Sequence, residues 1–181
     1  MPSRHSYSVS QKGFTLIELI VGMVVLGISF SVLTTLIHPV AQQSGDQLHQ
    51  VRAAELAQSV LNEIQNKAFD ENSDMAGGRV RCGEKSTSCS SSMGPEAGET
   101  RAVFNDVDDY HGLNYSAGTI RNSQGQLLDL YIGYQMNITV CNDANYDGTC
   151  SGDSQTAKLI TVTITTPTDF SMSFSTYRAN F

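Results

Sequence analysis

The stretch from residue 14 to residue 37 reads FTLIELIVGMVVLGISFSVLTTLI and contains a single charged residue, Glu18. As a helix, these 24 residues would be about 36 Å long, enough to cross a hydrocarbon layer about 30 Å thick. A cleaved secretory signal has a shorter apolar core, of about 7 to 15 residues, and a small-x-small site that residues 36–40 do not offer. The stretch therefore predicts a membrane-spanning helix over residues 14–38.

The charges around the apolar stretch predict its orientation. Arg4 and Lys12 precede it without any acidic residue, so the positive-inside rule keeps this end in the cytoplasm and places the C-terminal body across the membrane. The 181 residues include 11 Lys and Arg against 18 Asp and Glu, a formal charge of −7, and without residues 1–13 the balance is 9 against 18, or −9. A body this acidic, with no run of Lys or Arg, argues against nucleic acid as a partner.

Glu18 is the feature that a simple membrane anchor does not explain. An ionised carboxylate inside a bilayer costs about 3 kcal/mol on insertion scales, and the position of Glu18, fifth in the apolar stretch, lowers that cost by placing it near an interface. A carboxylate inside a membrane segment is a hypothesis of function, and it needs a cationic partner. Glu18 is therefore a candidate functional residue.

The run Lys12-Gly13-Phe14-Thr15-Leu16-Ile17-Glu18 resembles the prepilin signature of type IV pilins and of type II secretion pseudopilins. The resemblance implies that residues 1–13 are a leader peptide, which a prepilin peptidase removes between Gly13 and Phe14 before it methylates the new amino terminus of Phe14. It also implies that Glu18 neutralises the Phe14 ammonium of a neighbouring subunit, since either charge left alone out of water is costly.

The same resemblance implies where the protein resides and what it contacts. The expected location is the inner membrane with a periplasmic body, followed by the extracellular pilus. The expected partners are other major and minor pilins, the prepilin peptidase, the inner-membrane assembly platform, and the membrane itself before assembly. No enzymatic activity is expected.

Residues 39–69 return to helical spacing. Apolar residues recur every three or four positions, at Leu48, Val51, Ala54, Ala57, Leu61, Ile64 and Ala68, with polar residues between them. This pattern predicts an amphipathic continuation of the helix, whose apolar stripe packs against a globular body formed by residues 70–181. Residues 70–74 are expected to form the exit loop.

The C-terminal third predicts three antiparallel strands. Every even position from Leu128 to Val140 is apolar, and Ile160 to Ile164 and Phe170 to Phe174 repeat this alternation, with a tight turn at residues 167–169. Residues 101–104 are expected to form a further short strand. The predicted fold class is α+β and pilin-like: a long N-terminal helix, its hydrophobic half protruding, packed on a C-terminal antiparallel β-sheet.

The four cysteines form two local pairs, Cys82 with Cys89 and Cys141 with Cys150. A body outside the cytoplasm permits disulfides, and of the three possible connectivities the local one closes the shortest loops. A crossed pairing or free thiols are the alternatives, and the spacing of neither pair is typical of a zinc finger.

The second pair encloses a sequence that fits the start of a calcium loop, D-x-[DN]-x-[DN]-G. Its candidate ligands are Asp143, Asn145, Asp147, the carbonyl group of Thr149, and Asp153 in place of the usual glutamate. The alternative is a hairpin loop in which these residues only satisfy turn geometry. Calcium in this loop is the one cofactor that the sequence suggests.

Residues 104–112 concentrate Asp106, Asp108, Asp109 and His111, which could serve as metal ligands, as an acid/base pair, or as a turn-rich surface or packing motif. Residues 104–113 also resemble minor pilins of the mannose-sensitive haemagglutinin type of pilus. The resemblance implies a minor pilin that acts in pilus initiation or in the tip complex. The alternatives are a type II secretion pseudopilin and a membrane-anchored calcium- or ligand-binding module that does not polymerise.

Overall fold

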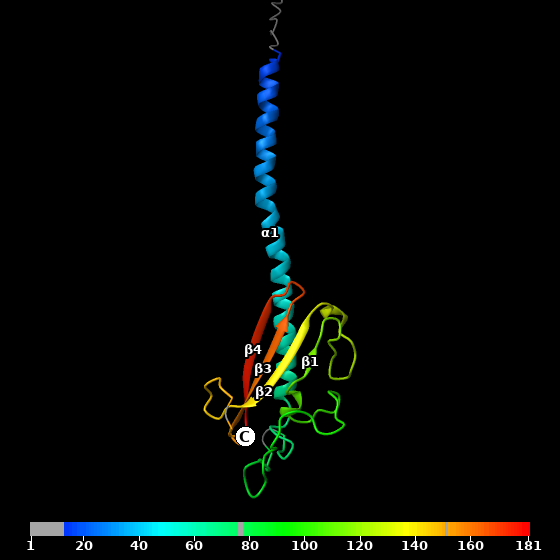
Figure 1. Ribbon diagram of the computed structural model, residues 1–181, viewed down its shortest axis with the longest axis vertical. Coiled ribbons are helices and arrows are strands. Elements are labelled where there is room, and N and C mark those ends of the chain that lie inside the picture. The colour runs from blue at the N-terminus through cyan, green and yellow to red at the C-terminus, as the bar shows by residue number, and fades with distance from the viewer. Residues whose placement is uncertain (1–12, 76–77, 151) are drawn as a thin grey trace, which may run out of the picture. The chain divides into compact units, whose positions relative to one another are not determined.

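A computed structural model describes residues 13–75, 78–150 and 152–181, except for the side chains of residues 36–44 (Figure 1). Its elements follow the chain in the order α1 (Leu16–Gln65), η1 (Asp108–Tyr110), β1 (Asn114–Tyr115), η2 (Asp129–Tyr131), β2 (Gln135–Asn142), β3 (Ala157–Thr165) and β4 (Ser171–Ala179). The chain divides into two compact units between Gly45 and Asp46, and each unit is described separately below.

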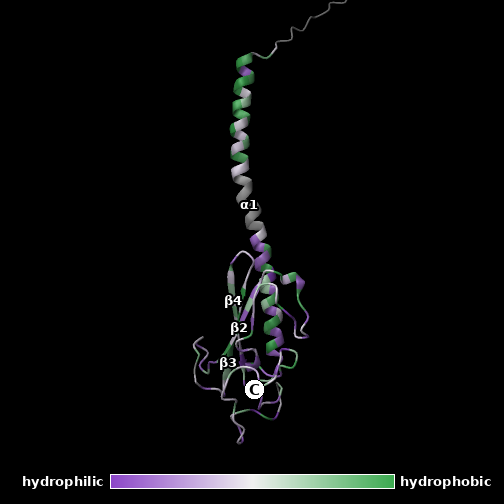
Figure 2. Cartoon of the chain, turned by 45° about the vertical axis from the view of Figure 1, so that its right-hand side comes forward, coloured by the Kyte–Doolittle hydropathy of each residue, from purple (hydrophilic) through white to green (hydrophobic). Residues whose placement is uncertain are grey.

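Helix α1 contributes a different kind of surface to each unit. The part within the N-terminal unit is coloured almost entirely as hydrophobic or neutral in Figure 2, whereas the part within the C-terminal unit mixes both kinds of residue. In the C-terminal unit, Ala53, Ala57 and Ile64 are fully buried. Their spacing of four and seven residues places them on one face of the helix.

The sheet is an antiparallel meander in the order β1-β2-β3-β4. Ile138 of β2 faces Val162 of β3, which in turn faces Phe174 of β4. The turn between β3 and β4 is closed by two backbone hydrogen bonds, in which Thr166 N–H donates to the Phe170 carbonyl group and Asp169 N–H to the Thr166 carbonyl group. The predicted meander and its tight turn are therefore confirmed.

The core lies between the C-terminal part of α1 and one face of the sheet. Even-numbered residues of β2 and β3 supply this face, and they are buried at Met136, Ile138, Val140, Ile160, Val162 and Ile164, as is Tyr134 just before β2. Burying a side chain of this size stabilises a fold by about 1.5–3 kcal/mol. The α+β, pilin-like layout expected from the sequence is confirmed.

Three expectations about secondary structure are wrong. Residues 128–134 are not a strand: η2 and the turn at Gly133, where φ is +88°, interrupt the alternation, and β2 begins at Gln135. Residues 101–104 form a turn instead of a strand, whereas the two-residue strand β1 was not predicted. Helix α1 ends at Gln65, before the expected boundary at residue 69.

The predicted apolar stripe is also partly wrong. Leu48 and Val51 are more than half exposed, and the buried stripe instead includes Ala53, Leu56 and Val60. Apolar residues in this part of the helix are numerous enough that two different sets, each spaced by three or four residues, could form the buried stripe. Only contact with the sheet decides which of them is buried.

Candidate functional site

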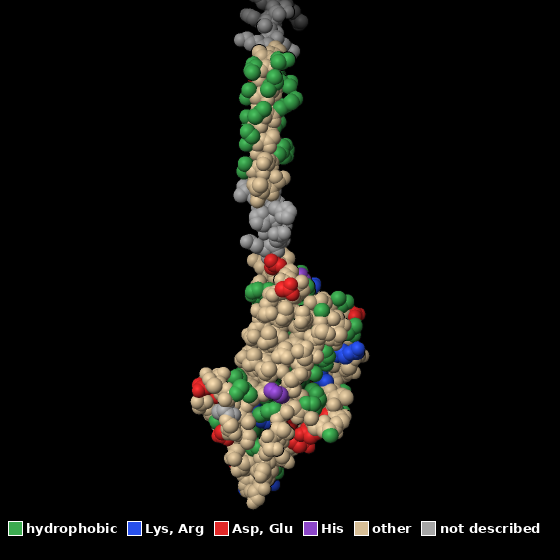
Figure 3. Space-filling model, viewed as in Figure 1, with side chains coloured by type: hydrophobic (Ala, Val, Ile, Leu, Met, Phe, Trp, Pro, Cys, Tyr) green, Lys and Arg blue, Asp and Glu red, His purple; other side chains and the backbone are tan. Residues whose placement is uncertain are grey.

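The described side chains of helix α1 in the N-terminal unit, up to Thr35, are all exposed. Residues Leu16–Thr35 form the one helix of the described chain that is long and apolar enough to cross a membrane, with a mean hydropathy of 2.5 and no residue buried. Figure 3 shows hydrophobic side chains along most of this segment, with other side chains prevailing at its lower end. Length and composition alone also fit a signal sequence, so the chemistry within the segment carries the argument.

Three of the four hydroxyl groups between Leu16 and Thr35 donate to carbonyl groups of the helix. Ser29 donates to the Val25 carbonyl group at 2.8 Å, Thr34 to that of Phe30 at 3.0 Å, and Thr35 to that of Val32 at 2.8 Å. Such back-bonding lets a hydroxyl group enter an apolar phase without an unpaired donor. Glu18 carries the only charged side chain of this segment, so its carboxylate is the group that most needs a partner from outside.

Glu18 lies in the first turn of α1, closer to the helix end than the sequence suggested. Its N–H donates to Thr15 Oγ1 at 3.4 Å, and Leu19 N–H donates to the Thr15 carbonyl group at 3.2 Å. Thr15 thus occupies the N-cap position with Glu18 three residues later, which is the spacing of a capping box. The partial positive charge of the helix N-terminus favours a carboxylate there.

Glu18 lies on the same face of the helix as Phe14, the residue at which the mature chain is predicted to begin. A shallow, mainly apolar groove is lined by Phe14, Glu18, Leu19, Gly22, Met23 and Leu26. Phe14 is 85% exposed, and a Cβ atom at Gly22 would meet nothing within 4 Å, so the groove is open along its length. This face offers a carboxylate at one end of an apolar strip to another helix.

The predicted processing site lies at the edge of the described chain. Gly13 and Phe14 are exposed and precede the first residue of α1, so the bond between them is outside regular structure. The remainder of the predicted leader, including Arg4 and Lys12, lies outside the described residues.

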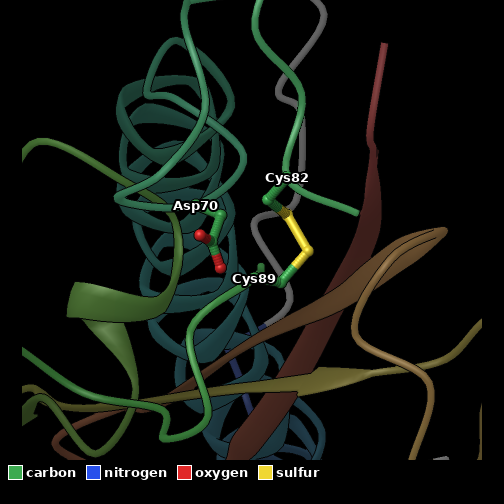
Figure 4. Close-up of side chains that lie close together, drawn as sticks. All are labelled: Asp70, Cys82 and Cys89. Atoms are coloured by element: carbon green, nitrogen blue, oxygen red, sulfur yellow. A yellow bond between two sulfur atoms is a disulfide. The ribbon is translucent and has the colours of Figure 1, made fainter. Parts of the chain in front are cut away.

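The body contains both predicted disulfides, Cys82–Cys89 and Cys141–Cys150. Figure 4 shows that the carboxylate of Asp70 lies beside the first of them, and the three side chains lie within 4.8 Å of one another. Because both sulfur atoms are bonded to each other, neither offers a thiolate to a metal ion. Asp70 instead accepts hydrogen bonds from Asn72 N–H and Ser90 N–H, which joins the helix exit to this loop.

In the predicted calcium loop, hydrogen bonds already reach every aspartate oxygen. Asp143 is fully buried and accepts from Asp147 N–H, Gly148 N–H and the Tyr177 hydroxyl group, the last at 2.7 Å. Burial alone would raise the pKa of Asp143, but the hydrogen bonds from Tyr177 and the backbone outweigh it and lower that pKa.

The other candidate ligands of that loop are engaged in the same way. Asp147 accepts from Thr149 N–H and from the Asn145 amide group, and Asp153 accepts from the next residues of its own turn. Within the described residues, the structure does not gather carboxylate oxygens of Asp143, Asp147 and Asp153 within 4.8 Å of one another. Calcium in this loop stays a prediction.

Most of the acidic segment at residues 104–112 is buried, as the packing-motif alternative expects, but the cation that pairs with it was not predicted. Asp106, Asp108 and Asp109 are at most 3% exposed. The ammonium group of Lys158, itself 1% exposed, lies 2.7 Å from Asp108 Oδ1 and 3.4 Å from Asp70 Oδ2, and it donates to the Phe69 carbonyl group. The alternation of strand β3 gave no signal for this, because Lys158 occupies an inward position among apolar residues.

A second buried ion pair joins α1 to the loops. The guanidinium group of Arg101 donates to both carboxylate oxygens of Glu63, at 3.1 and 2.7 Å, and Tyr110 donates to the same carboxylate at 2.8 Å. Burial, followed by the charge of Glu63, raises the pKa of Tyr110. These contacts are structural, because all the groups involved are satisfied by one another.

A further acidic group lies next to Asp109. Carboxylate oxygens of Glu96, Glu99 and Asp109 lie within 4.8 Å of one another. Loss of hydration, followed by the neighbouring carboxyl groups of Glu99 and Asp109, raises the pKa of Glu96 to about 7. No motif in the sequence marks this group, since its members come from two separate loops.

The comparisons with known proteins bear on the N-terminal unit. The family model of the prokaryotic N-terminal methylation motif matches residues 9–34. No curated protein and no solved structure matches the chain. The matched segment contains the Gly13–Phe14 junction, Glu18 and almost the whole apolar helix segment, so it supports a protein of the type IV pilin or prepilin class with a pilin or pseudopilin role. Pilins are in general structural proteins and not enzymes, and they assemble with other pilins after processing by a prepilin peptidase.

Proposed function

We propose that this chain is a minor pilin of a type IV pilus of the mannose-sensitive haemagglutinin type, similar to MshD, and that it acts in pilus initiation or in the tip complex. The observation that carries the pilin part of this proposal is the match of residues 9–34 to the methylation motif, on a helix segment that is exposed throughout. In this proposal residues 1–13 are the leader, cleavage falls between Gly13 and Phe14, and Phe14 is methylated.

The resemblance of residues 104–113 supports the narrower assignment to the haemagglutinin type of pilus. In the structure, most of this segment is interior, with Val107 and Tyr110 fully buried. The residues of this segment therefore have to fit the packing of the core, and they do not form an exposed ligand site. It supports a shared body architecture and leaves the surface that would contact other subunits to be found elsewhere.

Glu18 would act in assembly through its charge. After cleavage, the amino group of Phe14 and the carboxylate of Glu18 would be two opposite charges lining one apolar groove. When similar helices pack together and exclude water, each charge becomes costly unless it meets a partner, so the arrangement selects one axial register between subunits. The helix would thus exchange the lipid of the inner membrane for neighbouring helices in the extracellular filament.

The localisation and partners follow from the same proposal. The basic leader keeps the N-terminus cytoplasmic, and the body with its two disulfides would lie in the periplasm before assembly. Its partners would be the prepilin peptidase, the assembly platform of the inner membrane, and other major and minor pilins. The proposed role is non-enzymatic.

Glu18→Ala provides the test of assembly, with Glu55→Ala, an exposed glutamate of the same helix, as the matched control. We expect Glu18→Ala to reduce incorporation into pili at least about tenfold, as judged by immunoblots of sheared filaments, while Glu55→Ala leaves it unchanged. Mass spectrometry of the wild-type protein should find methylated Phe14 at the N-terminus. An unprocessed N-terminus together with normal function would contradict every pilin-class proposal.

Two other functions share parts of this architecture. A pseudopilin of type II secretion would have the same N-terminal unit, and deletion of its gene would impair secretion while pili remain. A membrane-anchored module that binds calcium or another ligand would not depend on Glu18 at all. Electron microscopy of pili and a secretion assay on a deletion strain separate the three, because loss of pili with secretion intact favours the minor pilin.

A further inference from the structure

The turn at residues 95–99 brings two glutamates to the same side. Glu99 N–H donates to the Glu96 carbonyl group at 3.1 Å, which closes a β-turn, and Gly98 adopts a φ of +93° within it. The turn lies against η1, because Gly94 N–H donates to the Asp108 carbonyl group at 3.0 Å. This arrangement places carboxylate oxygens of Glu96 and Glu99 within 4.8 Å of one on Asp109.

Asp109 contributes a buried oxygen that has no hydrogen-bond partner. The residue is 1% exposed. Its Oδ2 accepts from Asn105 N–H at 2.8 Å and from Asp106 N–H at 3.1 Å, whereas its Oδ1 accepts from no group of the described chain. Burying a carboxylate oxygen without a partner is unfavourable, so this atom indicates a ligand that protein groups do not supply.

Protein cations do not compensate this group. Among the described residues, Arg101 forms its salt bridge with Glu63, and Lys158 forms its salt bridges with Asp70 and Asp108. None of the salt bridges of the described chain includes Glu96, Glu99 or Asp109. Three carboxylates therefore converge without a counter-charge from the protein.

We propose that Glu96, Glu99 and Asp109 form a binding site for a divalent cation, and that the cation is calcium. Two oxygen ligands of one calcium ion, each about 2.4 Å from it, can be up to about 4.8 Å apart, which matches the spacing of these oxygens. An all-oxygen set of carboxylates suits calcium, and the exposed side of Glu96 leaves room for water ligands. The ion would fasten the turn at residues 95–99 to η1.

The test uses the full chain in non-ionic detergent micelles, with calcium chloride as the probe. We expect one calcium ion to bind in isothermal titration calorimetry, with a Kd of about 0.1–1 mM, as in extracellular calcium modules. At a calcium concentration about ten times Kd, Tm should rise by about 3–6 °C. The double variant Glu96→Gln, Glu99→Gln should abolish both effects, and Glu96→Gln alone should weaken binding at least about tenfold.

Two controls make the result decisive. Glu71→Gln with Glu84→Gln removes the same charge from exposed positions elsewhere, and Asp143→Asn with Asp147→Asn alters the calcium loop that the sequence suggests. Both control proteins should bind calcium like the wild type. Retention of calcium binding by the Glu96→Gln, Glu99→Gln protein, absence of binding by the wild type at 10 mM calcium, or an equal rise in Tm with magnesium would overturn the proposal.

Discussion

Two acidic regions of the body treat their carboxylates in opposite ways. In the predicted calcium loop, all carboxylate oxygens of Asp143, Asp147 and Asp153 accept hydrogen bonds, mostly from backbone N–H groups. Beside η1, by contrast, Asp109 Oδ1 and Asp106 Oδ2 are buried without a donor. The first region thus supplies a hydrogen-bond donor for every carboxylate oxygen, whereas the second leaves two buried carboxylate oxygens without one.

The difference shows what a sequence motif of acidic residues does and does not establish. Alternating Asp and Asn residues fit a calcium loop, but the same residues are equally suited to accept hydrogen bonds from turn backbone. In this protein the aspartates of the recognisable pattern do accept hydrogen bonds from backbone N–H groups of their own loop, and calcium binding there stays a prediction. The carboxylates that come together without a protein cation belong to residues 96, 99 and 109, and no local sequence pattern connects these residues.

The largest effect on stability is expected from removing Lys158, the cation that pairs with buried carboxylates beside η1. Lys158→Ala would leave Asp70 and Asp108 buried without their cation, so we expect the free energy of unfolding to fall by about 3–5 kcal/mol. Arg81→Ala, which removes the cation of a largely exposed pair with Glu84, should cost less than about 1 kcal/mol. Urea unfolding of both variants in detergent measures the difference. Similar losses in the two variants would show that the buried carboxylates beside η1 are not compensated by Lys158.

A smaller effect is expected from breaking the hydrogen bonds of the predicted calcium loop. Asp143→Ala would deprive the Tyr177 hydroxyl group and the Gly148 N–H of their shared acceptor, and we expect Tm to fall by about 3 °C or more. Tyr177→Phe removes only one of these donors and should lower Tm by less. If Tyr177→Phe proves the more harmful change, the carboxylate is not the centre of this network.

The same carboxylate gives the predicted calcium loop a pH dependence of definite sign. Because hydrogen bonds lower the pKa of Asp143 in the folded state below its ordinary 3.8, ionised Asp143 stabilises the fold fully above about pH 3.8. This stabilisation is lost as the pH falls through the lowered pKa. The difference in Tm between the wild type and Asp143→Asn should therefore be constant from pH 7 to pH 5 and shrink below pH 3.8.

The predictable parts of this protein are those that depend on neighbours in the sequence. The apolar run at residues 14–37 was found because it is long and contains a single charged residue, and the alternation in β3 from Ile160 to Ile164 is regular throughout. The same alternation failed at Leu130 and Ile132, which are exposed. There a 3₁₀ turn at Asp129–Tyr131 and the positive φ of Gly133 interrupt the chain before β2, and hydropathy indicates neither of them.

The buried charges were not predictable because their partners are far away in the sequence. Asp70, Asp108 and Lys158 come from a helix exit, a 3₁₀ turn and a strand, and each would be assigned to the surface by composition. Glu18 was found for the opposite reason, since a charge within 24 otherwise uncharged residues is conspicuous without any knowledge of the fold. A functional residue can be recognised from one sequence when it differs sharply from the residues next to it in the chain. It cannot be recognised when only the tertiary structure brings it together with its partners.

The smallest expected effect is a gain in stability, and it comes from removing a charge in the region beside η1. At pH 8, above the raised pKa of Glu96, and with calcium removed by a chelator, Glu96→Gln takes away one of three like charges whose oxygens lie within 4.8 Å, so repulsion falls and Tm should rise by about 1–2 °C. Glu84→Gln is the matched control, and because Glu84 pairs with Arg81 on the surface, it should leave Tm unchanged or slightly lower. Thermal unfolding of the two variants with and without the chelator measures both. A fall in Tm for Glu96→Gln without calcium would mean that Glu96 already has a favourable partner within the protein, and the contrast between the two acidic regions would then disappear.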